Sequence, residues 1–256
     1  MSTALVVAQR SLRKYMRTPQ LVVLGTVQGA MFLLIFRFVF GGAIKATGTS
    51  YVDFLVPGFV VTTILFVGAG ASAGVAEDVE QGFFDRLRSL PISRTASVAG
   101  RLVADSVTTA WGLAVTAAIG LAVGFRFHDS ALHALAGYGL CVVYGIAFAL
   151  VFICIGLFAG NAQAAQGMSL LVFPLTFVSS AYVPVASMPS WLQGIAEHQP
   201  ITVMTNAVRG LTQGDKAVAA LGHTTAYYVV LSVIWTAAII AVFAPIAVRR
   251  YSTMKR

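Results

Sequence analysis

The stretch LVPGFVVTTILFVGAGASAGVA (Leu55–Ala76), followed directly by EDVEQGFFDRLRSLPISR (Glu77–Arg94), decides the fold of this chain. The first part is a continuous apolar run, and roughly 20 such residues cross the hydrocarbon of a bilayer as a helix. The second part holds seven of the 26 acidic and basic residues of the chain. We therefore expect a membrane span that leads into a short amphipathic element on the membrane surface.

The composition excludes an ordinary soluble domain, since 58% of the residues are hydrophobic and only 10% are charged. Apolar runs without polar alternation favour helices over the strands of a barrel. The sequence predicts an all-α polytopic membrane protein, a single transmembrane domain over residues 1–256 with six spans. These spans are Leu21–Phe40, Leu55–Ala76, Gly100–Val123, Leu132–Ala159, Gly167–Val183 and Thr225–Val248.

Lysine and arginine are enriched on the cytoplasmic flanks of membrane spans. With the amino terminus inside, 12 of the 17 basic residues become cytoplasmic, so both termini are expected to be inside. Arg37 would lie near the outer end of the first span, and the outer side would hold Lys45, Arg126, Arg209 and Lys216. The net charge of +8 then matches anionic lipid head groups, and we expect no nucleic-acid partner.

Residues 1–18 form a basic amphipathic segment before the first span. Arg10, Arg13, Lys14 and Arg17 recur at helical spacing, and the opposite face is largely apolar. This pattern predicts an interfacial helix on the inner leaflet. Two roles remain open for it: anchoring alone, or anchoring together with contact to a cytoplasmic partner.

The loop over 184–223 is long enough to hold structure on the outer side. Ser190 and Gln193 match a capping box, in which each side chain would cap a backbone amide at the start of a helix. After Pro200, an apolar stripe at helical spacing precedes Gly214, which predicts a second helix ending there. The stripe consists of Met204, Ala207, Val208 and Leu211. We expect a hairpin of two short helices.

A few polar residues and one proline interrupt the spans. Pro174 should kink the fifth span, either as architecture or as part of a gate. Arg37 either reaches outward to the interface or lines a substrate path, and Gln28 either bridges helices or contacts substrate. Asp105 is expected to pair with Arg101 one turn earlier. No acidic residue lies at mid-membrane, which argues against ion-coupled transport.

Several short patterns in the sequence are typical of catalytic or ligand-binding sites. Ser72 lies in a Gly-x-Ser-x-Gly match, Gly70–Gly74, but all four histidines are expected near outer loops, so an intramembrane serine protease is only an alternative. Cys141 and Cys154 lack metal-ligand spacing, and no metal site is expected. No P-loop occurs, so any ATP must bind a separate chain. Close helix contacts are predicted at three Gly-x-x-x-Gly pairs, Gly70/Gly74, Gly120/Gly124 and Gly156/Gly160.

Within the charged stretch, the segment from Glu80 to Arg94 resembles the coupling region of ABC-2 type transporter permeases, particularly the daunorubicin/doxorubicin-resistance efflux type. The segment from Pro174 to Pro184, with Met188-Pro189, Trp191-Leu192 and Gln199-Pro200, is similar to the fifth span and outer hairpin of that family. Together with six spans and inside termini, the resemblance covers essentially the whole chain.

The resemblance implies the permease subunit of an ATP-driven exporter that moves an amphipathic drug or lipid-like molecule out of the cell. The permease itself is not an enzyme; cytoplasmic ATPase subunits would bind ATP and Mg²⁺, and a second permease copy or a related permease would complete the complex. The alternatives are export of a polysaccharide or lipid-linked glycan, a nucleotide-independent channel, and the protease. Within the coupling region, 77–94, the residues expected to contact the ATPase are Glu80, Gly82, Phe83, Phe84, Asp85, Arg86 and Arg88.

Overall fold

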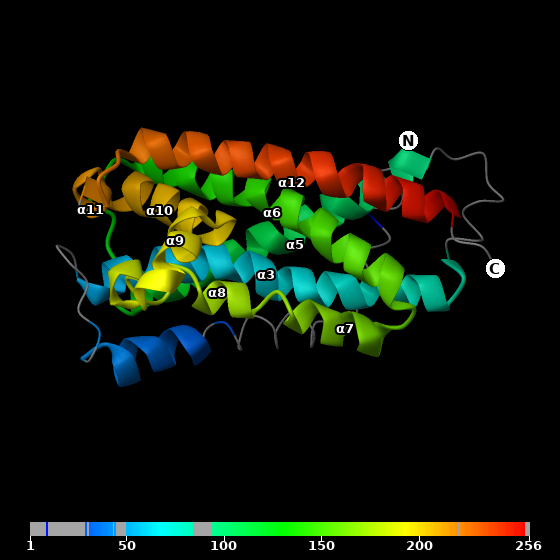
Figure 1. Ribbon diagram of the computed structural model, residues 1–256, viewed down its shortest axis with the longest axis horizontal. Helices are drawn as coiled ribbons and strands as arrows, with labels where there is room; N and C mark the ends of the chain where they lie inside the picture. The colour runs from blue at the N-terminus through cyan, green and yellow to red at the C-terminus, as the bar shows by residue number, and fades with distance from the viewer. Residues whose placement is uncertain are drawn as a thin grey trace.

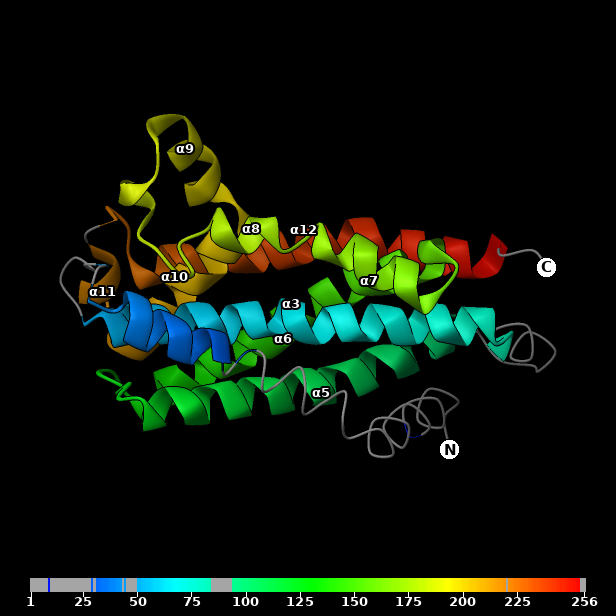
Figure 2. The same cartoon turned by 90° about the horizontal axis from the view of Figure 1, so that it is seen from below.

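The computed structural model describes residues 9, 29, 31–42, 44, 50–83, 94–219 and 221–253, with backbone only for 94–97 and 251–253. Within these ranges every regular element is helical, as predicted. Four helices are long and apolar enough to cross a membrane: α3 (Tyr51–Glu80), α5 (Arg94–Ala122), α6 (Ala131–Ala159) and α12 (Thr225–Thr253). They run along the long axis of the molecule (Figures 1 and 2). The second, third, fourth and sixth predicted spans are therefore helices that could cross a bilayer.

The shorter helices lie toward the two ends of this bundle. At one end, named the hairpin end, are α9 (Ser190–His198), α10 (Pro200–Gln213) and α11 (Lys216–Ala219), and α9 stands away from the long helices (Figure 2). At the opposite end, named the connection end, α3 stops at Glu80 and α5 begins at Arg94. The two short helices predicted between the fifth and sixth spans are confirmed, and α11 is an addition to them; their position on the outer side stays a prediction.

The first and fifth predicted spans are not seen as complete helices. Of the first, residues 29 and 31–40 are described; they are helical and end in the π-helix η1 (Phe36–Phe40). The fifth is broken into α7 (Ala162–Leu170), a turn, and α8 (Pro174–Phe177), after which the chain leaves helical geometry until the 3₁₀-helix η2 (Val185–Ser187). The expected kink at Pro174 is thus a break, and Pro174 occupies the first turn of a new helix, where its missing amide costs nothing.

The capping box predicted at Ser190 is wrong, although α9 does begin there. Pro189 holds the cap position and no side chain caps the helix. The Gln193 amide instead donates to the carbonyls of Met188 (2.8 Å) and Ala186 (3.5 Å), so it ties α9 to η2. The predicted stop is confirmed, because α10 ends at Gln213 and Gly214 follows with φ +83°.

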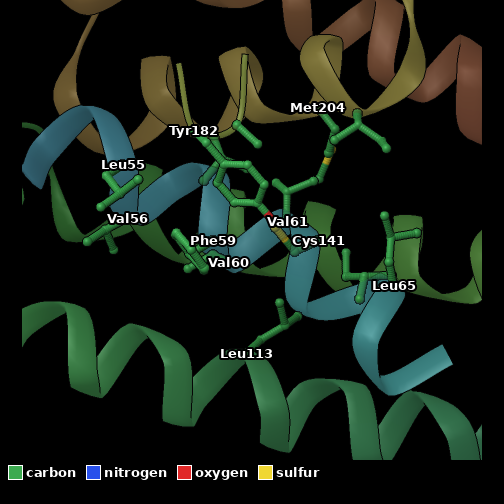
Figure 3. Packing of buried hydrophobic residues seen from close by; sticks show 14 of the residues in the cluster. Leu55, Val56, Phe59, Val60, Val61, Leu65, Leu113, Cys141, Tyr182 and Met204 are labelled. Atoms are coloured by element: carbon green, nitrogen blue, oxygen red, sulfur yellow. The ribbon is translucent and has the colours of Figure 1, made fainter. Parts of the chain in front are cut away.

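The helix α3 is the centre of the packing, in contact with α5, α6, α7 and α10. Its side chains meet Tyr182 from the segment after α8 and Met204 from α10 (Figure 3). A second buried cluster lies nearer the connection end and joins Val75 of α3 to α5, α6 and α12. The side chains of Cys141 and Cys154 are buried as free thiols.

The Gly-x-x-x-Gly pairs give close contacts at one glycine each. A Cβ at Gly120 would lie 2.5 Å from Val56, and one at Gly156 would lie 2.5 Å from the Ser72 carbonyl oxygen. Gly74 faces the guanidinium of Arg101. The other glycine of each pair makes no close helix contact. A Cβ at Gly70 would have no neighbour within 4 Å, and Gly124 and Gly160 lie at turns with positive φ. The motif predicted the right helices but only half of the packed positions.

Candidate functional site

The charged stretch begins as part of α3 rather than as a separate surface element. Residues 77–80 form the last turn of this helix, and the chain then leaves it through a left-handed turn. The Gln81 amide donates to the Glu77 carbonyl (2.9 Å) and the Gly82 amide to that of Val79 (3.0 Å). Gly82 has φ +62°, a conformation that favours glycine over residues with a side chain. Gly82 therefore sets the direction in which the chain leaves α3.

A buried group of three charged side chains joins the end of α3 to the start of α5. The Nε of Arg101 donates to both carboxylate oxygens of Asp105, at 3.1 and 3.2 Å, and its Nη1 donates to Asp78 at 3.4 Å. The Nη2 donates to the carbonyl of Ala71 at 3.0 Å. The exposed fractions of these side chains are 10% for Arg101, 5% for Asp78 and 2% for Asp105. We call this group the ionic clamp.

Helix electrostatics explain why Asp78 needs such a partner. It lies near the carboxyl end of α3, where the helix dipole is negative and disfavours another negative charge. Arg101 supplies the opposite charge from α5, and Gly74 leaves the space, since a Cβ there would lie 3.0 Å from Nη2. The clamp therefore connects the two helices that flank the coupling region.

The pairing of Arg101 with Asp105 is confirmed, whereas Asp78 was missed by the sequence reasoning. A signal for it exists: Ala71, Val75 and Asp78 lie on one face of α3 at helical spacing, and the first two are apolar. A carboxylate that continues an apolar face points inward and requires a partner.

The other predicted coupling residues are only partly described. Glu80 is exposed in the last turn of α3, and Gly82 and Phe83 are half-buried beyond it. Nine positions lie outside the described residues. Four are from the coupling region (Phe84, Asp85, Arg86 and Arg88), four are from the amino-terminal segment (Arg10, Arg13, Lys14 and Arg17), and one, Gln28, is from the first predicted span. Arg94 is described by its backbone alone.

Arg37 and Pro174 are both far along the chain from the clamp. Arg37 belongs to η1, is half-buried, and its guanidinium carbon lies 5.7 Å from the centre of the Phe38 ring. Its Nε is buried and has no acceptor among the described residues. Pro174 is exposed at the start of α8. A role for either in a substrate path or gate stays a prediction.

A polar stripe on α10 and its preceding residue holds the broken fifth segment in place. The Gln199 amide donates to the carbonyls of Leu175 (2.8 Å) and Val178 (2.7 Å). Thr202 accepts from the Ser180 amide at 3.0 Å, and the Arg209 guanidinium donates to the Ser180 carbonyl. Together these side chains satisfy backbone groups that a continuous helix would have satisfied internally.

Arg209, which the charge pattern predicts on the outer side of the membrane, is buried within the fold, with 3% of its surface exposed. Its Nε donates to the Phe54 carbonyl at 3.0 Å, and its guanidinium carbon lies 3.6 Å from the centre of the Phe54 ring. The position of a charged residue relative to a membrane span indicates on which side of the membrane it lies. It does not indicate whether the side chain points toward solvent or into the interior of the protein.

Ser72 has contacts that do not suit a nucleophile. Its hydroxyl lies 2.7 Å from that of Ser169 on α7 and donates to the Ala69 carbonyl at 2.8 Å. Two histidines contact the hairpin end: His128 lies 2.7 Å from Gln213, and His223 stacks on Tyr227. Ser72 therefore packs α3 against α7.

Comparison with known proteins agrees with these features. A sequence model described as "ABC-2 type transporter" matches residues 3–212. The chain is 32% identical over 222 residues to the daunorubicin resistance ABC transporter permease protein DrrB1 of Streptomyces coeruleorubidus, covering 86% of this chain and 76% of that protein. It is 26% identical over 253 residues to the probable doxorubicin resistance permease DrrC of Mycobacterium tuberculosis, with 97% and 89% covered. For the probable multidrug permease YbhR of Escherichia coli the identity is 28% over 169 residues, with 64% and 45% covered.

Proposed function

Because the chain belongs to the ABC-2 type transporter family, as the permease subunit of an exporter whose ATPase is a separate chain, we propose that it moves an amphipathic drug or lipid-like molecule out of the cell. The proposed substrate class is supported mainly by the 32% identity to a daunorubicin resistance permease over most of both chains. The intramembrane protease and the channel are not proposed, since this family assignment accounts for the whole fold.

We place the docking site of the ATPase at the connection end, on Glu80, Gly82, Phe83, Phe84, Asp85, Arg86 and Arg88. The ionic clamp supports this site, because it ties together the helices on both sides of it. A push on the coupling region would then move α3 and α5 as one body, rather than being absorbed in a flexible loop. ATP and Mg²⁺ would bind only on the ATPase.

This placement makes the connection end cytoplasmic, with both chain termini on that side. Arg10, Arg13, Lys14 and Arg17 would then hold the amino-terminal helix on the inner leaflet. The hairpin end would face outward. Gln28, Arg37 and the break at Pro174 are the proposed elements of the substrate path or gate, and the break supports this role because short helices separated by a turn can tilt independently.

A second permease copy or a related permease would complete the exporter. Two helices support this inference because most of their apolar surface is not covered by this chain. Of the apolar 18-residue stretch that could cross a membrane, only 33% is buried in α5 and 11% in α12. The exposed apolar side chains of α5 include Val103, Val107 and Trp111. Lipid and a second permease are the partners whose chemistry suits such faces inside a membrane.

The test is ATP-driven transport of daunorubicin in liposomes that contain the purified chain and a candidate ATPase subunit. Glu80→Ala and Arg86→Ala should reduce both co-purification of the ATPase and transport, with normal membrane insertion. Asp129→Ala removes an acidic group near the hairpin end and serves as the control. Unchanged transport by both coupling variants would contradict the docking site, and transport without ATP would contradict the exporter.

A further inference from the structure

A cavity of about 420 Å³ lies at the hairpin end, between α3, α9, α10, α12 and the segment that follows α8. Small-molecule sites in proteins usually measure roughly 300–1,000 Å³, so the volume suits a ligand head group or a small ligand. Phe54 and Tyr228 contribute to its walls, and Thr202, Asn206 and Arg209 of the polar stripe reach it from α10. The cavity therefore has a polar side and an aromatic side.

The guanidinium of Arg209 forms the charged part of the lining. It donates to neutral acceptors: the carbonyls of Phe54 and Ser180, the Ser180 hydroxyl at 3.0 Å and the Asn206 side-chain oxygen at 2.9 Å. A guanidinium has five N–H groups, so one remains after these four bonds. Among the described residues no carboxylate forms an ion pair with it. A buried positive charge without a counter-charge favours an anion in the adjoining space.

The two carboxylates that line the cavity do not fill this role. Asp53 is already bonded, since its oxygens accept from the Ser50 hydroxyl at 2.6 Å and the Arg126 amide at 3.3 Å. Glu197 is exposed at the surface of α9, where water screens its charge. Asp53 is half-buried and Glu197 is exposed, whereas Arg209 and Asn206 are each 3% exposed.

We propose that this cavity binds the anionic head group of an amphiphile, with Arg209 as the cationic partner. Asn206 and the hydroxyl of Thr202, both buried in the lining, supply neighbouring hydrogen-bonding groups. The apolar part of the ligand would rest on Leu231 and on the ring of Tyr227, which is 41% exposed at the cavity. The site goes beyond the proposed transport function, and its occupation needs no ATPase.

Calorimetric titration of the purified chain, in an uncharged maltoside detergent, tests the proposal. Dodecyl phosphate should bind saturably, and dodecyltrimethylammonium, with the same tail and the opposite charge, should not. Ala217→Glu places a carboxylate in the cavity wall and should weaken binding of dodecyl phosphate by about tenfold or more. Ala219→Glu adds the same charge at an exposed position of the same helix and should bind as the wild type does.

The Arg209→Gln variant should also lose binding, but it alters the support of the broken segment, so Ala217→Glu is the decisive variant. Equal affinity of Ala217→Glu and wild type would overturn the site. Tighter binding of dodecyltrimethylammonium than of dodecyl phosphate would overturn the choice of charge. Inorganic phosphate binding as tightly as dodecyl phosphate would overturn the amphiphile and leave a site for free anions. Because binding is measured without the ATPase, failure here is separate from failure of transport.

Discussion

Replacing Arg101 by glutamine is expected to destabilise the chain strongly. The guanidinium makes bonds to Asp78, Asp105 and the Ala71 carbonyl, and both carboxylates are almost fully buried. The variant leaves these carboxylates in place and removes the guanidinium that lies between them. Removal of one partner of a buried ion pair costs about 3–5 kcal/mol, because the remaining charge has lost its compensation.

The two free cysteines give a direct assay for this loss. Cys141 and Cys154 are buried, so a fluorogenic thiol reagent reacts with them only as the helices separate on heating. At roughly 2–4 °C per kcal/mol for a chain of this size, the unfolding midpoint of Arg101→Gln should fall by on the order of 10 °C. Lys216→Gln removes a positive charge from an exposed position on α11 and should shift the midpoint by less than about 2 °C.

A combined variant separates the loss of charge compensation from the loss of packing. With Asp78→Asn and Asp105→Asn added to Arg101→Gln, no uncompensated charge of the clamp remains. Neutral replacement of a whole buried ionic group is much less costly than removal of one member. The triple variant should therefore be more stable than Arg101→Gln alone. A single variant that melts like the wild type, or a triple variant that melts no higher than the single one, would refute the electrostatic account of the clamp.

Three further predictions concern the backbone and the packing. Gln199→Leu leaves the carbonyls of Leu175 and Val178 without their donor, at about 1–3 kcal/mol for each unsatisfied group, and should lower the midpoint in the same thiol assay. Gly82→Ala opposes a φ of +62° by about 1–2 kcal/mol, so it should lower the unfolding midpoint by about 2–8 °C and should also reduce ATP-driven transport. Full transport would contradict the role of this turn. Gly156→Leu has no space beside α3 and should elute as aggregate in size-exclusion chromatography, whereas Gly139→Leu, with no neighbour within 4 Å, should elute as the wild type does.

Four of the six predicted spans could be recognised from the sequence because the bilayer leaves so few choices. A continuous apolar run must satisfy its backbone within itself, and a helix does so. The predicted range Leu132–Ala159 differs from α6 by a single residue at its start, where Ser130 accepts a hydrogen bond from the His133 amide. In such a segment the apolar composition and the need to satisfy the backbone hydrogen bonds both favour a membrane-spanning helix.

The fifth segment shows where that reasoning stops. Gly167–Val183 is a largely apolar run like the other predicted spans, and Pro174 alone is compatible with a mild kink. The chain from α8 onward depends on partners that lie 20 to 30 positions further along the sequence, such as Gln199, which is 24 positions after Leu175. A hydropathy pattern describes each segment by itself, so it cannot reveal a hydrogen-bond donor that lies so far along the sequence.

The polar face of α10 could nevertheless have indicated the break. Gln199, Thr202, Asn206 and Arg209 follow one face at helical spacing, opposite the stripe of Met204 and Val208 that predicted the helix. On a helix exposed to water such residues need no explanation. In a chain with so few polar groups, four hydrogen-bonding side chains on one face require partners, and the backbone of a broken span has unsatisfied groups to offer. Non-helical backbone in a membrane protein implies a donor-rich face elsewhere in the same chain, and the two should be sought together.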